Sequence, residues 1–171
     1  QDKMNDWLAN KAPREEEFQE GAARQFILPL LSHLGFSPGQ ARLLSVACGL
    51  AADVDVLNDA GYPTWGIDCG NRVMRWTDRR HREQLARADL FKLPFADASF
   101  DLVMAINVIE HIGVVGDTTV VAPDYQEQRV QALSSLLRVT RPGGYLLVTG
   151  VNRLFPLDFF HTQQARLVRV H

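Results

Sequence analysis

The stretch "LSVACGLAADV" (residues 44–54) is the first place in the chain where residue types and spacing favour chemistry, since it is typical of a strand, a sharp bend and a helix. Such a bend leaves backbone N–H groups unpaired beside the positive end of the helix. Ala47, Gly49 and Ala51 are small enough to let a polar ligand approach. A tight structural turn packed with small residues is the alternative interpretation of the same pattern.

An acidic residue follows this bend at the spacing of a nucleotide site. Asp68 stands 19 residues after Gly49, at the end of the next predicted strand. A carboxylate there can accept hydrogen bonds from both ribose hydroxyls, and about 20 residues is the expected separation. A helix cap before Asn71 is the other role open to Asp68. The bend and the acid together indicate an adenosine ribose, which a nicotinamide dinucleotide and S-adenosylmethionine both carry.

Alternating elements would position these residues. Short aliphatic runs alternate with helical stretches, which predicts an α/β fold with a doubly wound, mainly parallel sheet and helices on both faces. Ligands bind such sheets at the carboxyl ends of the strands. The predicted strands cover 43–47, 64–68, 87–90, 102–107 and 145–150, with a single remaining strand at 166–170; the predicted helices cover 14–35, restarting at Pro29, and 51–60, 71–85 and 125–139.

One domain accounts for the 171 residues, because 46% of them are hydrophobic and suffice for a core. We expect an N-terminal helical cap over 1–40, a cofactor-binding core over 41–150 and an incomplete C-terminal segment over 151–171. The 21 residues after Gly150 are too few for the helix and strand pair that would complete the sheet.

Two later stretches distinguish between the two cofactors. "RADLFKLPFADASFDLVMAINVIEHI" (87–112) and "LLRVTRPGGYLLVTG" (136–150), with the bend, resemble class I S-adenosylmethionine-dependent methyltransferases, particularly the group that modifies small molecules. The resemblance spans roughly residues 41–150. It implies a Rossmann-like methyltransferase fold, S-adenosylmethionine as cofactor and a small-molecule methyl acceptor.

The resemblance also implies roles for individual residues. The bend would face the methionine portion, Asp68 would bind the ribose, and Asp89 would accept a hydrogen bond from the adenine amino group beside the Leu90 backbone. Asp89 has an alternative role, as a residue that ends a strand and caps a turn. The implied cofactor-binding residues are Ala47, Cys48, Gly49, Asp68, Cys69, Asp89, Leu90, Asn107 and Val108.

His111 is the candidate catalytic residue. The donor is already activated, so the enzyme chiefly aligns the acceptor and excludes water. His111 follows the fourth predicted strand, where it can remove a proton from an acceptor oxygen or nitrogen, or simply bind loop backbone. We expect the connection 112–124 to form an acceptor-side wall, and the N-terminal helix to close over the cofactor. Aromatic residues of the segment 152–162 would shape an apolar pocket or seal the core: Phe155, Phe159 and Phe160, with His161 beside them.

Three positions depart from the family pattern. Ser45 stands where the family carries an acid, and Ala47 and Ala51 stand where it carries glycines. An alanine forced to positive φ at position 51 costs on the order of 1 kcal/mol. Two alternatives follow: a binding module that keeps the fold without turnover and, with less support, a nicotinamide-dependent oxidoreductase.

Charge and composition exclude several other classes. The net charge of −2 recruits neither nucleic acid nor an anionic membrane. No apolar run is long enough to cross a bilayer, and the two cysteines fit the reducing cytoplasm. The histidines and cysteines lack metal-ligand spacing, so no metal is expected. Four arginines spaced three or four residues apart favour a solvated helix face over a phosphate-binding stripe: Arg72, Arg75, Arg79 and Arg82.

Overall fold

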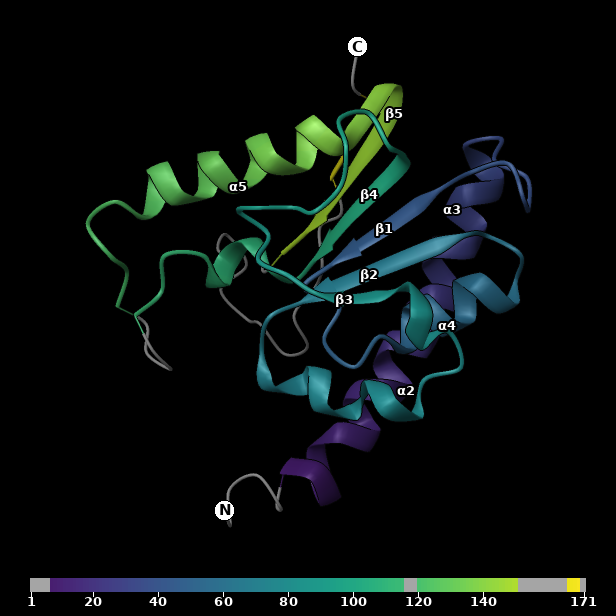
Figure 1. Ribbon diagram of the computed structural model, residues 1–171, viewed down its shortest axis with the longest axis horizontal. Coiled ribbons are helices and arrows are strands. Elements are labelled where there is room, and N and C mark those ends of the chain that lie inside the picture. Colours follow the sequence, from purple (N-terminus) through teal and green to yellow (C-terminus); the bar gives the residue numbers. More distant parts are fainter. Residues whose placement is uncertain (1–6, 116–119, 151–165, 170–171) are drawn as a thin grey trace, which may run out of the picture.

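A six-stranded sheet forms the centre of the protein, which is described by a computed structural model over residues 7–115, 120–150 and 166–169 (Figure 1). The strands lie in the order β3-β2-β1-β4-β5-β6. β1 to β5 are parallel, and β6 is antiparallel to β5. This confirms the predicted doubly wound, mainly parallel sheet. The strand bounds are β1 Leu43–Val46, β2 Thr64–Asp68, β3 Leu85–Arg87, β4 Phe100–Ile106, β5 Thr140–Thr149 and β6 Arg166–Arg169.

Helices cover both faces of the sheet (Figure 1). α2 (Ala12–Ala22), α3 (Leu28–His33) and α4 (Ala52–Asp59) lie on one face, and α5 (Tyr125–Val139) lies on the other. Every residue of β1 is buried, as expected for a central parallel strand. One apolar cluster joins α3 and α4 to β1, and another joins α5 to the opposite face of β1 and β4. A smaller cluster packs Cys48, Ala51 and Val54 against Trp76.

The N-terminal helix changes character halfway along. A π-helical segment, Ala23–Ile27, separates α2 from α3, and a second one, Trp7–Lys11, precedes α2. Pro29 stands within the first turn of α3, directly after the π-helical segment, and the backbone of Ile27 and Leu28 at the junction stays helical. The helix was predicted to kink or restart at Pro29; it changes from π-helical to α-helical one residue earlier and continues without a break.

The predicted helix over 71–85 is wrong. Two short 3₁₀ helices, Asn71–Asp78 and Arg82–Gln84, take its place, and β3 begins at residue 85, earlier than the predicted 87. The N–H groups of Arg80 and His81 donate to the Asp55 carboxylate at 3.4 and 3.0 Å. A tertiary acceptor thus replaces the carbonyls that a continuous helix would offer.

The remaining predictions concern the C-terminal strand, the connection 112–124 and the aromatic segment 152–162. β6 confirms the single C-terminal strand expected at 166–170. Within the connection 112–124, Val114 pairs with Val121 in an antiparallel bridge. The aromatic segment 152–162 lies outside the described residues. Among the helices that are described, none joins the length and the apolarity needed to cross a membrane.

Candidate functional site

A cavity of about 360 Å³ opens at the carboxyl ends of β1, β2 and β4, where the chain turns from β1 into α4. This is the edge at which the strand order reverses around β1, the usual ligand position in such sheets. Seven of the ten predicted site residues line it: Ala47, Cys48, Gly49, Asp68, Asn107, Val108 and His111.

The bend between β1 and α4 has a strained backbone. Ala47, Gly49 and Ala51 have φ values of 50°, 57° and 60°. A left-handed conformation at an alanine costs on the order of 1 kcal/mol, so the two alanines carry strain that glycine would avoid. The positive φ anticipated for Ala51 is therefore present. Such strain gathers at ligand sites, where the backbone shape matters more than its local stability.

Asp68 holds the bend and the end of β2 together. Its Oδ2 accepts a hydrogen bond from the Gly49 N–H at 2.8 Å, and its Oδ1 accepts one from the Gly70 N–H at 2.6 Å. The carboxylate stays half-buried at the cavity wall. Each oxygen keeps lone-pair capacity for a further donor such as a ribose hydroxyl.

The structure places three predicted residues outside the cavity wall: Cys69, Asp89 and Leu90. Asp89 is exposed, and its Oδ1 caps the following turn by accepting the Phe91 N–H at 2.9 Å. Burial raises the pKa of the Cys69 thiol, and the carboxylates of Asp68 and Asp89 raise it further. Asp68 lines the cavity, whereas Cys69 and Asp89 do not.

The end of β4 supplies the opposite wall. Asn107 has a φ of 53°, and its N–H donates to the carbonyl and the hydroxyl of Thr149 at 3.2 and 3.1 Å. This ties the end of β4 to the end of β5. His111 closes a short 3₁₀ turn, Ile109–His111, and is exposed at the cavity. It has the access that a general base requires.

The N-terminal helix contributes residues that sequence reasoning missed. Gln19 of α2 donates to the Cys48 carbonyl at 3.1 Å and accepts the Ala52 N–H at 3.1 Å. Its amide therefore provides hydrogen-bond partners for one carbonyl of the bend and for one N–H at the start of α4. Glu15 and Phe18 line the same cavity. Their helical spacing in the sequence was the available signal, and it fits the expected closing role of this helix.

Ser45 and Asp53 were also missed as a pair. Ser45 Oγ donates to Asp53 Oδ2 at 2.7 Å, and both side chains line the cavity although both residues are buried. Burial raises the pKa of Asp53; the Ser45 hydroxyl and nearby backbone N–H groups offset part of that effect. Nothing in the one-dimensional sequence joins these two residues, because strand and helix meet only after folding.

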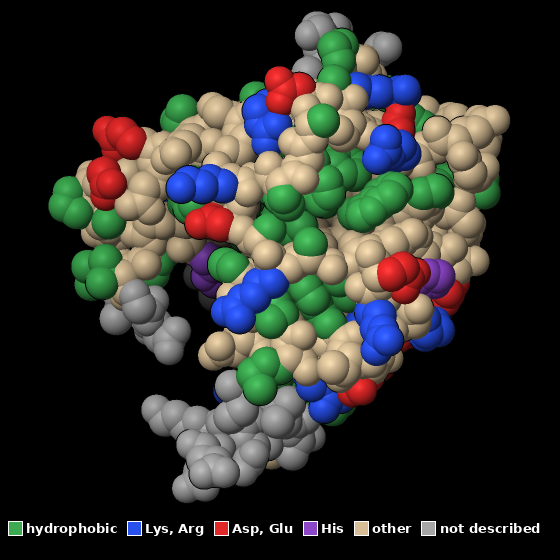
Figure 2. Space-filling view, in the orientation of Figure 1, with side chains coloured by type: hydrophobic (Ala, Val, Ile, Leu, Met, Phe, Trp, Pro, Cys, Tyr) green, Lys and Arg blue, Asp and Glu red, His purple; other side chains and the backbone are tan. Residues whose placement is uncertain are grey.

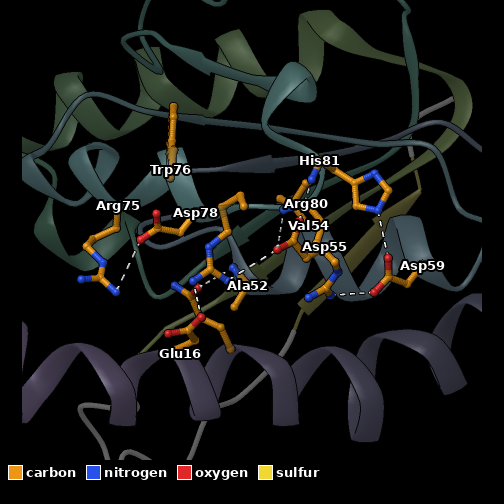
Figure 3. A network of polar contacts seen from close by, with 12 residues as sticks. Glu16, Ala52, Val54, Asp55, Asp59, Arg75, Trp76, Asp78, Arg80 and His81 are labelled. Carbon is orange, nitrogen blue, oxygen red and sulfur yellow. Dashed lines mark hydrogen bonds and ion pairs between the residues drawn. The ribbon is translucent and has the colours of Figure 1, made fainter.

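The arginine stripe was predicted to be a solvated face, which holds for Arg72, Arg75 and Arg82 but not for Arg79. Arg79 has only 7% of its side chain exposed and pairs with Glu16 of α2 and, at 3.6 Å, with Asp55 of α4. Arg72 pairs with Glu15 at 2.6 Å. Figure 3 shows the adjoining contacts of Asp59 with Arg80 and His81, at 2.6 and 2.9 Å. The pairs of Glu15 with Arg72 and of Glu16 with Arg79 dock α2 against the core.

A second, apolar cavity of about 380 Å³ adjoins the first and shares Phe18, Ala22 and Ile106 with it. Phe18 and Phe26 are 52% and 44% exposed, which is unusual for large apolar side chains. The rest of the wall consists of Gly21, Gln25 and Thr149. The described part of the connection 112–124 lines neither of the two cavities.

Surface charge is mixed over the face seen in Figure 2, where acidic and basic side chains lie beside one another. The sequence carries 18 basic and 20 acidic side chains, so its overall field is weak. Recognition must come from the two cavities rather than from a long-range field.

Known proteins share the fold of this chain, and a family model matches its sequence. The family described as "Methyltransferase domain" matches residues 44–148. A demethylmenaquinone methyltransferase of Beutenbergia cavernae is 33% identical over 120 residues, which cover 69% of this chain and 43% of that protein. A Mycolicibacterium smegmatis protein, "Probable S-adenosylmethionine-dependent methyltransferase", is 29% identical over 130 residues, 71% of this chain and 45% of its own length.

The chain thus spans less than half the length of these two relatives. Among solved structures, the PH0226 protein from Pyrococcus horikoshii OT3 superposes with a TM-score of 0.61 at 19% identity, covering 85% of this chain and 57% of that one. At that identity the superposition shows the fold alone.

Proposed function

Since the chain belongs to the methyltransferase domain family, which implies S-adenosylmethionine as its cofactor, we propose that it transfers a methyl group from S-adenosylmethionine to a small molecule. The observation that carries this proposal is the left-handed bend at Ala47, Gly49 and Ala51, in which the Gly49 N–H donates a hydrogen bond to the Asp68 carboxylate. The bend lines the cavity, and the Asp68 carboxylate beside it can accept a hydrogen bond from a ribose hydroxyl.

The residues present fit this cofactor. Asp68 lines the cavity and accepts one backbone N–H on each carboxylate oxygen, so both oxygens keep a lone pair for a ribose hydroxyl. A Cβ at Gly49 would lie 3.0 Å from the Gln19 amide and 3.0 Å from the Glu15 carboxylate, so a larger side chain would not fit between the bend and α2. The cofactor, when bound, supplies an activated methyl group on a sulfonium. The bend, Asp68, Asn107 and Val108 would hold it, with Asp89 and Leu90 at its adenine end.

His111 is the proposed general base. It is exposed at the cavity, near the end of β4 where Asn107 and Val108 would lie close to the reacting methyl group. An imidazole near neutral pH accepts a proton from a hydroxyl or amine while the acceptor atom attacks in line. Its contribution would be on the order of a hundredfold in rate.

The second cavity supports an acceptor with an apolar body. It adjoins the first along Phe18 and Ile106, and Phe26 extends its apolar wall. Apolar walls with few polar groups bind flat or aliphatic small molecules. A relative named for demethylmenaquinone methylation is consistent with this class, and we propose apolar phenols and quinols as acceptors.

A reducing compartment, the cytoplasm, is the proposed location. Cys48 is buried and Cys69 exposed, and both are free thiols. An exposed thiol persists where the surroundings keep it reduced.

Calorimetric titration with S-adenosylhomocysteine tests the cofactor assignment, with NADH as the comparison ligand. We expect heat with S-adenosylhomocysteine and none with NADH; the reverse would favour an oxidoreductase. Transfer of labelled methyl groups to a panel of apolar phenols and quinols then tests turnover. Cofactor binding without transfer to any acceptor would instead favour a binding module.

A further inference from the structure

The turn that carries His111 is bonded to a helix on the other face of the sheet. His111 closes the 3₁₀ turn Ile109–His111 and lines the cavity together with residues of α2. Arg129 belongs to α5, which covers the opposite face (Figure 1). Its Nε donates to the Ile112 carbonyl at 3.2 Å, and its Nη2 donates to the Glu110 carbonyl at 3.2 Å. One guanidinium therefore bonds the backbone on either side of His111.

The two carbonyls are groups that a short 3₁₀ turn leaves without partners of its own. The last carbonyls of a helix find no N–H within that helix, and a three-residue turn forms few internal bonds. The His111 N–H donates to the Val108 carbonyl at 3.0 Å, and the Val114 N–H donates to the His111 carbonyl at 3.3 Å. With Arg129 included, the carbonyls of residues 110–112 all have donors, so the backbone that carries the imidazole is held on both sides.

The first turn of α5 packs directly against the loop that follows His111. Gly113 has a φ of 77°, and a Cβ added there would lie 2.5 Å from the Tyr125 Cβ. The Tyr125 N–H donates to the Ala122 carbonyl at 3.1 Å. The Arg129 guanidinium lies over the Tyr125 ring, 5.0 Å from its centroid, which is a favourable cation–π distance. Arg129 is thus supported by its own helix where it reaches the turn.

An arginine suits this contact better than a lysine does. The planar guanidinium presents several N–H donors in a fixed arrangement, so one side chain can bond two carbonyls that lie two residues apart. An ammonium has its donors on a single nitrogen at the end of a flexible stem. Arg129→Lys is therefore expected to hold the turn less firmly than Arg129 does.

We infer that Arg129 is a positioning residue for methyl transfer, which holds the His111 turn so that the imidazole stays at the cavity. The inference rests on the proposed function, in which His111 is the general base. Arg129 is not among the described residues that line the cavity, so it acts through the turn. A base must lie within hydrogen-bond reach of the proton that it removes, and a small displacement of a catalytic group lowers the rate strongly.

Hydrogen exchange tests the placement of the turn without any acceptor. Arg129→Met removes every donor of the side chain and keeps an unbranched apolar stem. The amides of His111, Ile112 and Val114 should then exchange about tenfold faster or more, because the turn opens more often. Exchange at these three amides as slow as in the unaltered chain would overturn the inference.

Arg138→Met is the matched control. Arg138 lies further along α5 and also donates to two loop carbonyls, those of Leu93 and Phe95, at 2.9 and 2.8 Å. Its loss should leave exchange over 109–114 as in the unaltered chain. Equal acceleration over 109–114 in both variants would mean that any loss of contacts to α5 loosens the turn, and would contradict a specific role for Arg129.

Steady-state kinetics test the consequence for the reaction, with labelled S-adenosylmethionine and the fastest acceptor of the phenol and quinol panel. Arg129→Met should lower kcat by about tenfold and leave S-adenosylhomocysteine affinity within about twofold. Arg129→Lys should lie between Arg129→Met and the unaltered chain, and Arg138→Met should keep the unaltered kcat. Weaker S-adenosylhomocysteine binding with an unchanged kcat in Arg129→Met would contradict the inference.

A double-substitution cycle with His111→Ala separates positioning from a general loss of stability. His111→Ala alone should lower kcat by about a hundredfold. Adding Arg129→Met to it should change the rate by less than about twofold, because the side chain that Arg129 positions is already gone. Additive losses would overturn the inference.

Failure of the proposed function has a different signature. No methyl transfer by the unaltered chain, or an unchanged rate in His111→Ala, would refute the proposed activity or the proposed base. Hydrogen exchange in Arg129→Met would still decide whether Arg129 holds the turn.

Discussion

Helix α4 carries two buried aspartates, two residues apart, whose surroundings are opposite. Asp55 accepts the N–H groups of Arg80 and His81 and pairs with the Arg79 guanidinium. Asp53 instead accepts the Ser45 hydroxyl at 2.7 Å and forms no ion pair with a basic side chain among the described residues. The comparison shows how one helix serves two purposes: its outer side fixes the fold through ion pairs and backbone hydrogen bonds, and its inner side lines the cavity.

Asp55→Ala should have the largest effect. It removes the acceptor of two backbone N–H groups and one of the two carboxylates that pair with the buried Arg79 guanidinium, so unfolding free energy should fall by about 2–4 kcal/mol. Urea unfolding followed by circular dichroism measures the loss. Asp59→Ala serves as control, since its ion pairs are solvent-exposed and should contribute less than about 1 kcal/mol. Equal losses in the two variants would remove the distinction drawn here.

Asp68→Ala should weaken S-adenosylhomocysteine binding by about 1–3 kcal/mol, because a hydrogen-bonding carboxylate leaves the cavity wall. Asp89→Ala should lie near the lower end of that range, since Asp89 is exposed and caps its own turn. Calorimetric titration measures both, with exposed Asp97→Ala as control. Unchanged affinity in Asp68→Ala would refute the ribose assignment.

Asp53 and Asp59 should give opposite pH dependences of stability. The pKa of Asp53 is raised above its usual 3.8 by burial, so its favourable contribution holds below that value and is lost as pH rises through the folded-state pKa. The pKa of Asp59 is lowered, chiefly by hydrogen bonds from His81 and Arg80, so its contribution holds above 3.8 and is lost on further acidification.

Urea unfolding over a pH series checks both slopes. Relative to the unaltered chain, Asp53→Asn should gain stability as pH rises, and Asp59→Asn should be less sensitive to acid. Matching slopes in the two variants would show that their surroundings do not differ in the way described.

Ala51→Gly should have the smallest effect. It relieves a left-handed alanine, worth about 1 kcal/mol, but loses a buried methyl group and adds unfolded-chain entropy, so the net change should be within about 0.5 kcal/mol. Ala52→Gly is the matched control. It is equally buried but helical, so glycine should lower stability there by about 1 kcal/mol. A larger loss at Ala51 would mean that its strain is absent.

The sequence predicted the sheet well because buried strands are continuous apolar runs, and β2 and α5 have the predicted bounds. The local sequence pattern wrongly predicted a helix over 71–85, because the Asp55 carboxylate accepts the N–H groups of Arg80 and His81 there. It also predicted an exposed Arg79, whose burial depends on α2 lying alongside.

The candidate site divides in the same way. Gly49 and Asp68 were predictable because their separation along the chain reflects one strand, one bend and one helix. Gln19 and Asp53 were not, since their places in the cavity are set by how two helices pack against β1. Asp89 follows β3 as predicted, but its side chain caps the next turn at the surface and does not line the cavity.

The Gln19 amide gives ligand exchange a particular starting point. It already provides partners for the Cys48 carbonyl and the Ala52 N–H, so neither of these backbone groups lacks a hydrogen bond. Any molecule that needs those two groups must compete with a glutamine anchored on a docked helix, and its measured affinity is the surplus over that competition. Gln19→Ala would leave the Cys48 carbonyl and the Ala52 N–H to water. We therefore expect this substitution to change the residence time of a bound ligand more than its specificity.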